Sequence, residues 1–131
     1  MPPGRQRNQI RARRIEDLLE IYRETPTGTF ELALRKFNAQ HADMPYAIDE
    51  PQCLVTDLLA DMRHFARHRQ EDIHALLRNH PDGGVVSSPE LKGLIDDLRK
   101  FADEHGLCWE TTLDCSMMHF ETEMRHEIYI S

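Results

Sequence analysis

The sequence predicts an all-α fold, with one small domain of about five helices over residues 10–131. Apolar residues recur at the three- and four-residue spacing of amphipathic helices, and turns containing proline or glycine separate these stretches. With 131 residues the chain has the length of a single domain and can bury a core without disulfide bonds. Charged residues make up 30% of the chain and hydrophobic residues 40%, which is typical of a soluble globular protein.

The first half of the chain predicts two helices. Residues 1–9 contain two prolines and a glycine, and we expect them to form a disordered basic arm. A helix is expected from about Ile10 to the turn at Pro26, and a second helix from Phe30 to about His41. Their apolar faces consist of Ile15, Leu18, Leu19 and Tyr22, and of Phe30, Ala33, Leu34 and Phe37.

A third helix is predicted after the connector of residues 42–52. Its apolar stripe extends from Val55 to Leu77, and a charged segment interrupts this stripe. We therefore expect the helix to break near Arg69. Residues 79–87 combine asparagine, proline and glycine, which is typical of a loop.

The last two predicted helices are joined by a turn at His105 and Gly106. Ser88 and Pro89 form a typical helix start, and Gly106 suits the left-handed position after a helix end. We expect the core to contain Phe65, Leu98, Phe101, Leu113 and Phe120, with Trp109 in or beside it.

Part of the third helix is similar to part of the fourth. Residues 57–77 align with residues 93–113 without gaps. The identical positions are Leu58, Asp61, Arg63, Phe65, Ala66 and Leu77, matched by Leu94, Asp97, Arg99, Phe101, Ala102 and Leu113. An internal duplication of a helix and turn explains the match, and so does the shared pattern of two amphipathic helices. In either case we expect the two stretches to pack as neighbours.

The cysteine count and the N-terminus indicate a reduced, cytoplasmic protein. Three cysteines are an odd number, and no apolar segment of the secretory type follows the basic N-terminal residues. No run approaches 18 apolar residues, so we expect no membrane span. Nothing in the sequence indicates a cofactor.

Positive charge is concentrated at the N-terminus of a chain whose net charge is −7. The first 14 residues contain no acid and five arginines, namely Arg5, Arg7, Arg11, Arg13 and Arg14. One interpretation is that these arginines bind nucleic-acid phosphates. The other is that they solubilise the chain or pair with its acidic part, which itself repels nucleic acid.

Residues 97–106 (DLRKFADEHG), followed by Asp114 and residues 119–123 (HFETE), resemble a pattern in small accessory proteins of bacterial plasmids, integrative elements and phages. Residues 57–64 resemble the opening of the same pattern. The similarity extends over about residues 54–126. It implies a helical protein that acts by binding other proteins, and it supplies no catalytic residues.

Four residues near the last turn have side chains that suit zinc: His105, Cys108, Cys115 and His119. Positions 108, 115 and 119 share one face of a helix. The alternative is that the cysteines pack as small apolar side chains. No nucleophile is accompanied by both a base and an oxyanion hole, so we do not expect an enzyme.

The favoured function is therefore a non-enzymatic regulator or inhibitor from a mobile genetic element that binds a protein partner. Its acidic helices would occupy a nucleic-acid-binding site on that partner, as a nucleic-acid mimic does. The exposed acids expected to bind the partner are Asp61, Asp96, Asp97, Asp103, Glu104 and Glu121. The alternatives are a nucleic-acid-binding regulator that uses the arginine arm and a small zinc-dependent protein.

Overall fold

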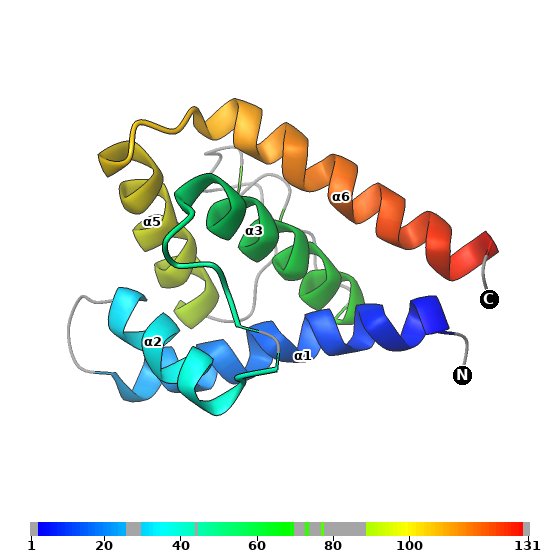
Figure 1. Ribbon diagram of the computed structural model, residues 1–131, viewed down its shortest axis with the longest axis horizontal. Coiled ribbons are helices and arrows are strands. Elements are labelled where there is room, and N and C mark those ends of the chain that lie inside the picture. Colours follow the sequence, from blue (N-terminus) through cyan, green and yellow to red (C-terminus); the bar gives the residue numbers. More distant parts are fainter. Residues whose placement is uncertain are drawn as a thin grey trace.

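Five α-helices make up most of the part of the chain that the computed structural model describes, which is residues 3–25, 30–43, 45–69, 73, 77 and 89–129 (Figure 1). They are α1 (Pro3–Glu24), α2 (Phe30–Gln40), α3 (Pro51–His68), α5 (Pro89–Glu104) and α6 (Trp109–Tyr129). The described residues contain no strand, so the predicted all-α fold is confirmed.

Helix α1 begins at Pro3, earlier than the start near Ile10 that the apolar pattern predicts. Residues 3–9 are therefore helical and not a disordered arm. Proline fits the first turn of a helix, and the arginines and glutamines that follow it are good helix formers. The apolar pattern gives no signal here because Asn8, a polar residue, provides a buried contact of this segment.

Helix α3 lies at the centre of the bundle, with α1, α5 and α6 around it (Figure 1). Every position from Leu54 to Ala66 is buried except Asp57. Helix α1 packs against all four of the other helices. Helix α6 runs towards the start of α1, so the two ends of the chain lie at the same end of the molecule in Figure 1. This arrangement brings side chains of α1, α3 and α6 together.

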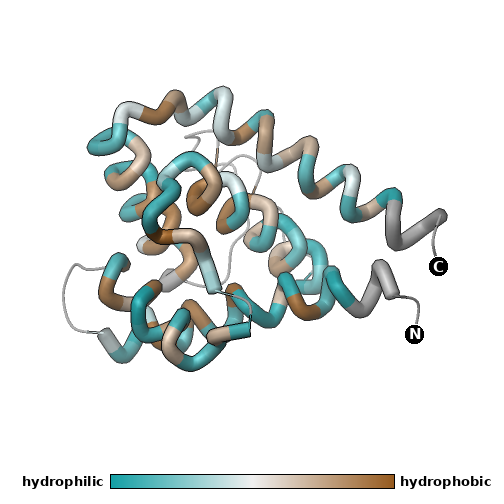
Figure 2. Tube along the Cα trace, in the orientation of Figure 1, coloured by the Kyte–Doolittle hydropathy of each residue, from teal (hydrophilic) through white to brown (hydrophobic). Residues whose placement is uncertain are grey.

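The core is apolar and joins all five helices. Hydrophobic and hydrophilic residues alternate along the helices in Figure 2, as expected for amphipathic helices. Phe30 and Phe101 pack edge to face, with ring centroids 5.1 Å apart. The predicted core residues Phe65, Leu98, Phe101 and Leu113 are buried. Phe120 is only half-buried, and its ring lies 4.8 Å from the ring of His64.

The predicted break in the third helix is confirmed. Helix α3 ends at His68, and the backbone N–H of Arg69 donates to the carbonyl oxygens of Phe65 and Ala66. Of the segment beyond this point, Ile73 and Leu77 are described, and both are buried. The predicted loop at residues 79–87 falls outside the described residues.

The turn between α5 and α6 depends on Gly106. Its φ of 68° lies in the left-handed region, which favours glycine. The N–H of Gly106 donates to the carbonyl of Asp103 at 3.1 Å, and the N–H of Leu107 donates to the carbonyl of Ala102 at 2.8 Å. These two bonds form the Schellman motif that terminates α5.

The first of the two similar stretches begins on α3, and the second begins on α5 and continues through the turn into α6. Helices α3 and α5 are in contact, as predicted. Whether the two stretches arose by duplication stays a prediction. Trp109 is half-buried beside the core, and its indole N–H donates to the carbonyl of Leu77 at 2.7 Å. Among the described helices, none has the length and apolar character needed to cross a membrane.

Candidate functional site

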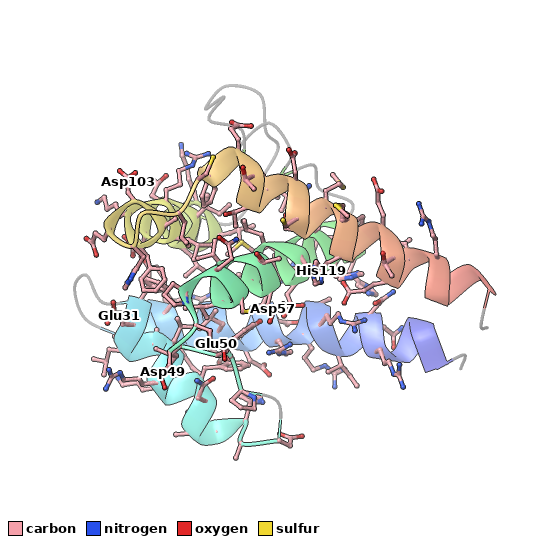
Figure 3. The ribbon with its side chains drawn as sticks, turned by 45° about the horizontal axis from the view of Figure 1, so that its top comes forward. Glu31, Asp49, Glu50, Asp57, Asp103 and His119 are labelled. Carbon is pink, nitrogen blue, oxygen red and sulfur yellow. The ribbon has the colours of Figure 1, made fainter. Side chains whose placement is uncertain are left out.

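Four of the six acids predicted to bind a partner lie on the surface. They are Asp96, Asp103, Glu104 and Glu121. Glu110 and Asp114 are also exposed, on the first two turns of α6. We call these six residues the α5–α6 acidic surface. The turn at Gly106 brings the end of α5 next to the start of α6, and Asp103 marks that end in Figure 3.

The prediction that Asp61 is exposed is wrong, since only 3% of this residue is accessible. Its Oδ2 accepts a hydrogen bond from the hydroxyl of Tyr46 at 2.7 Å and pairs with Nη1 of Arg14 at 3.1 Å. The guanidinium of Arg14 also lies over the Tyr46 ring, 4.0 Å from its centroid. The physical reason is that α1 and the connector cover the side of α3 on which Asp61 lies, so this position does not face solvent.

Asp97 is half-buried and is engaged with α1. It accepts a short hydrogen bond from the hydroxyl of Tyr22. Burial, together with this bond, raises the pKa of Tyr22 well above its usual value, so Tyr22 is a neutral donor. Asp61 and Asp97 occupy equivalent positions of the two similar stretches, and both accept from a tyrosine hydroxyl. We therefore leave both out of the α5–α6 acidic surface.

Two of the five predicted phosphate-binding arginines point into the molecule. Arg11 donates through Nη1 to Oδ1 of Asn8 at 2.6 Å, and its Nε lies 2.6 Å from Oε2 of Glu123. Arg14 pairs with Asp61 as described. Arg7 and Arg13 are exposed, but six residues along a helix separate them by about 120° around its axis. The side chain of Arg5 is not among those described.

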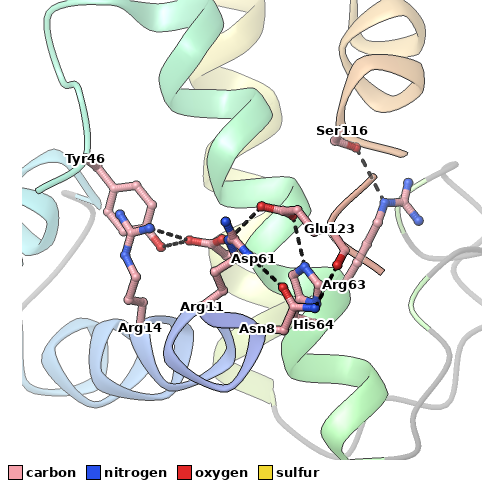
Figure 4. Close-up of polar contacts among 9 residues, drawn as sticks. All are labelled: Asn8, Arg11, Arg14, Tyr46, Asp61, Arg63, His64, Ser116 and Glu123. Carbon is pink, nitrogen blue, oxygen red and sulfur yellow. Dashed lines mark hydrogen bonds and ion pairs between the residues drawn. The ribbon is translucent and has the colours of Figure 1, made fainter. Parts of the chain in front are cut away.

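These contacts belong to a larger polar network between α1, α3 and α6 (Figure 4). Nε2 of His64, which is fully buried, lies 3.0 Å from Oε1 of Glu123. The side-chain amide of Asn8 donates to the backbone carbonyl of Glu123 at 3.2 Å. We call the whole network the polar clasp; its members are Asn8, Arg11, Arg14, Tyr46, Asp61, His64 and Glu123.

The electrostatic environments of the two carboxylates in the polar clasp are different. Burial raises the pKa of Asp61 to about 7, although Arg14 and the Tyr46 hydroxyl oppose this effect. Burial alone would raise the pKa of Glu123 as well. The hydrogen bond with His64 and the charge of Arg11 outweigh this effect, so the pKa of Glu123 is lowered. Glu123 is therefore a stable anion at neutral pH, while Asp61 titrates near neutrality.

Sequence reasoning did not identify Asn8, Tyr46, His64 or Glu123 as members of one network. Tyr46 lies in the connector, and the side chain of Asn38 fixes its backbone through bonds of 2.8 Å and 2.9 Å. His64 lies on the side of the third helix opposite its apolar stripe, where the pattern predicts a solvated side chain, so the sequence carried no signal of its burial.

The predicted zinc ligands do not form a site. His105 is exposed and packs its ring 4.2 Å from that of Phe101, while Cys108 is an exposed free thiol just before α6. Within the described ranges, no three histidine, cysteine, aspartate or glutamate side chains are arranged to hold a metal ion.

Cys108 has an unusual environment for a surface thiol. The side-chain hydroxyl of Thr111 and backbone N–H groups of the first turn of α6 lower its pKa. The thiol of Cys53, also exposed, is affected in the opposite direction, because its hydrogen bond with Glu50 raises its pKa.

Comparison of the chain with protein-family models, with curated proteins and with solved structures gives no match. The α5–α6 acidic surface and the polar clasp are therefore the features of the molecule that indicate a function.

Proposed function

We propose that this protein is a non-enzymatic regulator or inhibitor that binds a protein partner through the α5–α6 acidic surface. The partner class is a protein with a basic, nucleic-acid-binding site, which the acidic surface occupies in place of nucleic acid. The resemblance of residues 54–126 to accessory proteins of plasmids, integrative elements and phages supports a protein-binding role and an origin in a mobile element.

The observation that carries the proposal is the inward orientation of Arg11 and Arg14. Both arginines pair with carboxylates inside the polar clasp, so the most basic segment of the chain does not present its full charge to solvent. The exposed carboxylates of α5 and α6 give the α5–α6 acidic surface a mainly negative charge, which the exposed Lys100 interrupts on α5. A surface of one sign attracts partners of the other and accelerates their association.

The spacing of the acids on α6 is compatible with mimicry of a nucleic-acid strand. Glu110 and Asp114 are four residues apart, which corresponds to a rise of about 6 Å along the helix. Alternate phosphates of one DNA strand are separated by about 6.8 Å along the duplex axis. Glu121 continues this face of α6 about 10 Å beyond Asp114.

Met118 adds an apolar contact to the same face. It lies one turn after Asp114 and just before Glu121, and 66% of the residue is exposed. Methionine adapts its shape to different surfaces, and an apolar side chain surrounded by charged ones is typical of a protein-binding site. Met118 therefore favours a protein partner over a small ion.

The test is a pull-down of the tagged protein from host lysate, with nuclease treatment, followed by affinity measurements on the partner that it identifies. Replacing Asp103 and Glu104 by lysine should abolish binding. Both positions lie in the last turn of α5, where positive charge is favourable to the helix, so the fold should be retained.

The matched control is the double replacement of Asp43 and Asp49 by lysine. Both acids are exposed in the connector, and the change in net charge is the same. Loss of affinity in the α5 variant with retention in the control supports the assignment. Equal affinity in both variants would show that the α5–α6 acidic surface is not the binding site.

The zinc-dependent alternative has no support among the described side chains. Measurement of zinc in the purified protein provides a direct test, and a stoichiometric content would revive it.

A further inference from the structure

We propose that the N-terminal half of α1 is an autoinhibitory latch, in which Glu123 and Asp61 occupy Arg11 and Arg14, and that its release presents an arginine face that binds nucleic-acid phosphates. This activity is separate from partner binding by the α5–α6 acidic surface.

The two halves of α1 are held by different kinds of contact. Between Arg7 and Arg14 the buried residues are Asn8 and Ala12, so the inward contacts of this half are mainly those of the polar clasp. The second half contributes Ile15, Leu18 and Leu19 to the apolar core. Separation of the first half therefore exposes little apolar surface, and the core remains intact.

The two arginines that the latch holds, Arg11 and Arg14, share one face of α1 with the exposed Arg7. Arg7, Arg11 and Arg14 follow each other at four- and three-residue spacing, which places them within about 60° of one another around the axis of α1. They extend over about 10 Å of that axis. In the closed state Arg11 and Arg14 are directed towards Glu123 of α6 and Asp61 of α3 (Figure 4). A released α1 would present all three arginines to solvent.

The carboxylates of the polar clasp bind the two guanidinium groups that a phosphate would bind. Oε2 of Glu123 lies 2.6 Å from Nε of Arg11, and Oδ2 of Asp61 lies 3.1 Å from Nη1 of Arg14. Guanidinium groups bind carboxylate and phosphate oxygens with the same charge-assisted geometry. Nucleic acid and the internal carboxylates therefore compete for the same two arginines.

Glu123 is the residue on which the latch depends most. It contacts Arg11 and His64 through its side chain and Asn8 through its backbone carbonyl. Replacing Glu123 by lysine puts a positive charge opposite Arg11 and should release the latch. Glu24, in the last turn of α1, is exposed and belongs neither to the polar clasp nor to the α5–α6 acidic surface, so its replacement by lysine gives a control with the same net charge.

The experiment measures binding of the full chain to a fluorescent DNA duplex by anisotropy, at about 50 mM and about 200 mM salt. Glu123→Lys should bind about tenfold more tightly than Glu24→Lys. The released Arg11 and Arg14 should neutralise two further phosphates. The slope of log Kd against log salt concentration should therefore be steeper by about 2 for Glu123→Lys than for the control. Adding Arg11→Ala to Glu123→Lys should remove most of the gain. Equal affinities of the two lysine variants would overturn the proposal.

Amide hydrogen exchange on the same proteins distinguishes release from unfolding. In Glu123→Lys, residues 3–14 should lose protection while α3 and α5 keep theirs. If Glu123→Lys loses its cooperative unfolding transition, the pair Glu123→Gln and Glu24→Gln replaces it, with a gain of about threefold expected for Glu123→Gln alone. A uniform loss of protection over all helices in Glu123→Gln would show that α1 does not open by itself.

Discussion

Asp61 and Tyr46 are joined by a buried hydrogen bond of 2.7 Å between the carboxylate of α3 and the hydroxyl of the connector. Burial raises the pKa of both groups. A neutral tyrosine thus donates to a carboxylate that is itself close to protonation at neutral pH. The pair ties the connector to the central helix, and it makes the stability of the fold sensitive to pH.

Asp61 should make the protein less stable as the pH rises towards neutrality. Its pKa of about 7 in the folded protein is above the usual value of 3.8, so the folded state binds the proton more tightly than the unfolded state. This contribution to the free energy of unfolding is fully present below about pH 4 and is lost as the pH rises through 7. Urea denaturation of Asp61→Asn between pH 5 and about 8 should show a flatter profile than the wild type. The control Asp96→Asn removes an exposed carboxylate and should keep the wild-type slope; an unchanged slope in Asp61→Asn would contradict the prediction.

Phe101 should contribute strongly to the stability of the core. Only 4% of the residue is exposed, and its ring packs against Phe30 from α2. Replacement by alanine should lower the free energy of unfolding by about 3 to 5 kcal/mol in chemical denaturation. A loss of less than about 1 kcal/mol would mean that the site collapses around the cavity or that this contact is absent.

Gly93→Ala should stabilise the protein. Gly93 lies inside α5, where glycine lowers helix stability by about 1 kcal/mol relative to alanine. A Cβ at this position would lie 3.5 Å from the hydroxyl oxygen of Tyr22, which is an ordinary van der Waals distance. The thermal midpoint should therefore rise by a few degrees. A lower midpoint would show that the added methyl group displaces Tyr22 from Asp97.

Cys108 should be alkylated faster than Cys53 at neutral pH. Both thiols are exposed, but the hydroxyl of Thr111 lowers the pKa of Cys108, whereas Glu50 raises that of Cys53. The thiolate is the reactive species, so the rate follows its fraction. Peptide mass spectrometry after brief iodoacetamide treatment measures both sites in one sample. In Thr111→Val the difference in alkylation rate between Cys108 and Cys53 should be smaller. Equal rates at the two cysteines in the wild type would contradict the prediction.

The helices were predictable because their apolar residues follow the periodicity of the helix. The same holds for the break at Arg69 and the end of α5 at Gly106, where a charged segment and a glycine interrupt the pattern. The first turns of α1 were not predictable in this way. Their inward contacts are made by Asn8 and Arg11, and the sequence pattern does not distinguish a buried polar contact from a solvated one.

The candidate site was predictable only in part, and Asp61 shows why. The exposed acids of α5 and α6 lie on helices with one free side, so their outward position follows from the pattern. Helix α3 has neighbours on most sides, and this depends on how the other helices assemble around it. Asp61 is buried whereas Asp57, one turn earlier, is exposed, and the partners of Asp61, Tyr46 and Arg14, come from distant parts of the sequence.

Trp109 gives the molecule an optical reporter of its own. It is the single tryptophan of the chain and the first residue of α6. Its indole N–H donates to the backbone carbonyl of Leu77. Indole emission changes when this hydrogen bond and the partial enclosure of the ring are lost. Fluorescence therefore follows the attachment of one backbone position to α6, whereas circular dichroism follows all the helices together. Coincidence of the two signals during unfolding would mean that this attachment and the bundle form in a single event.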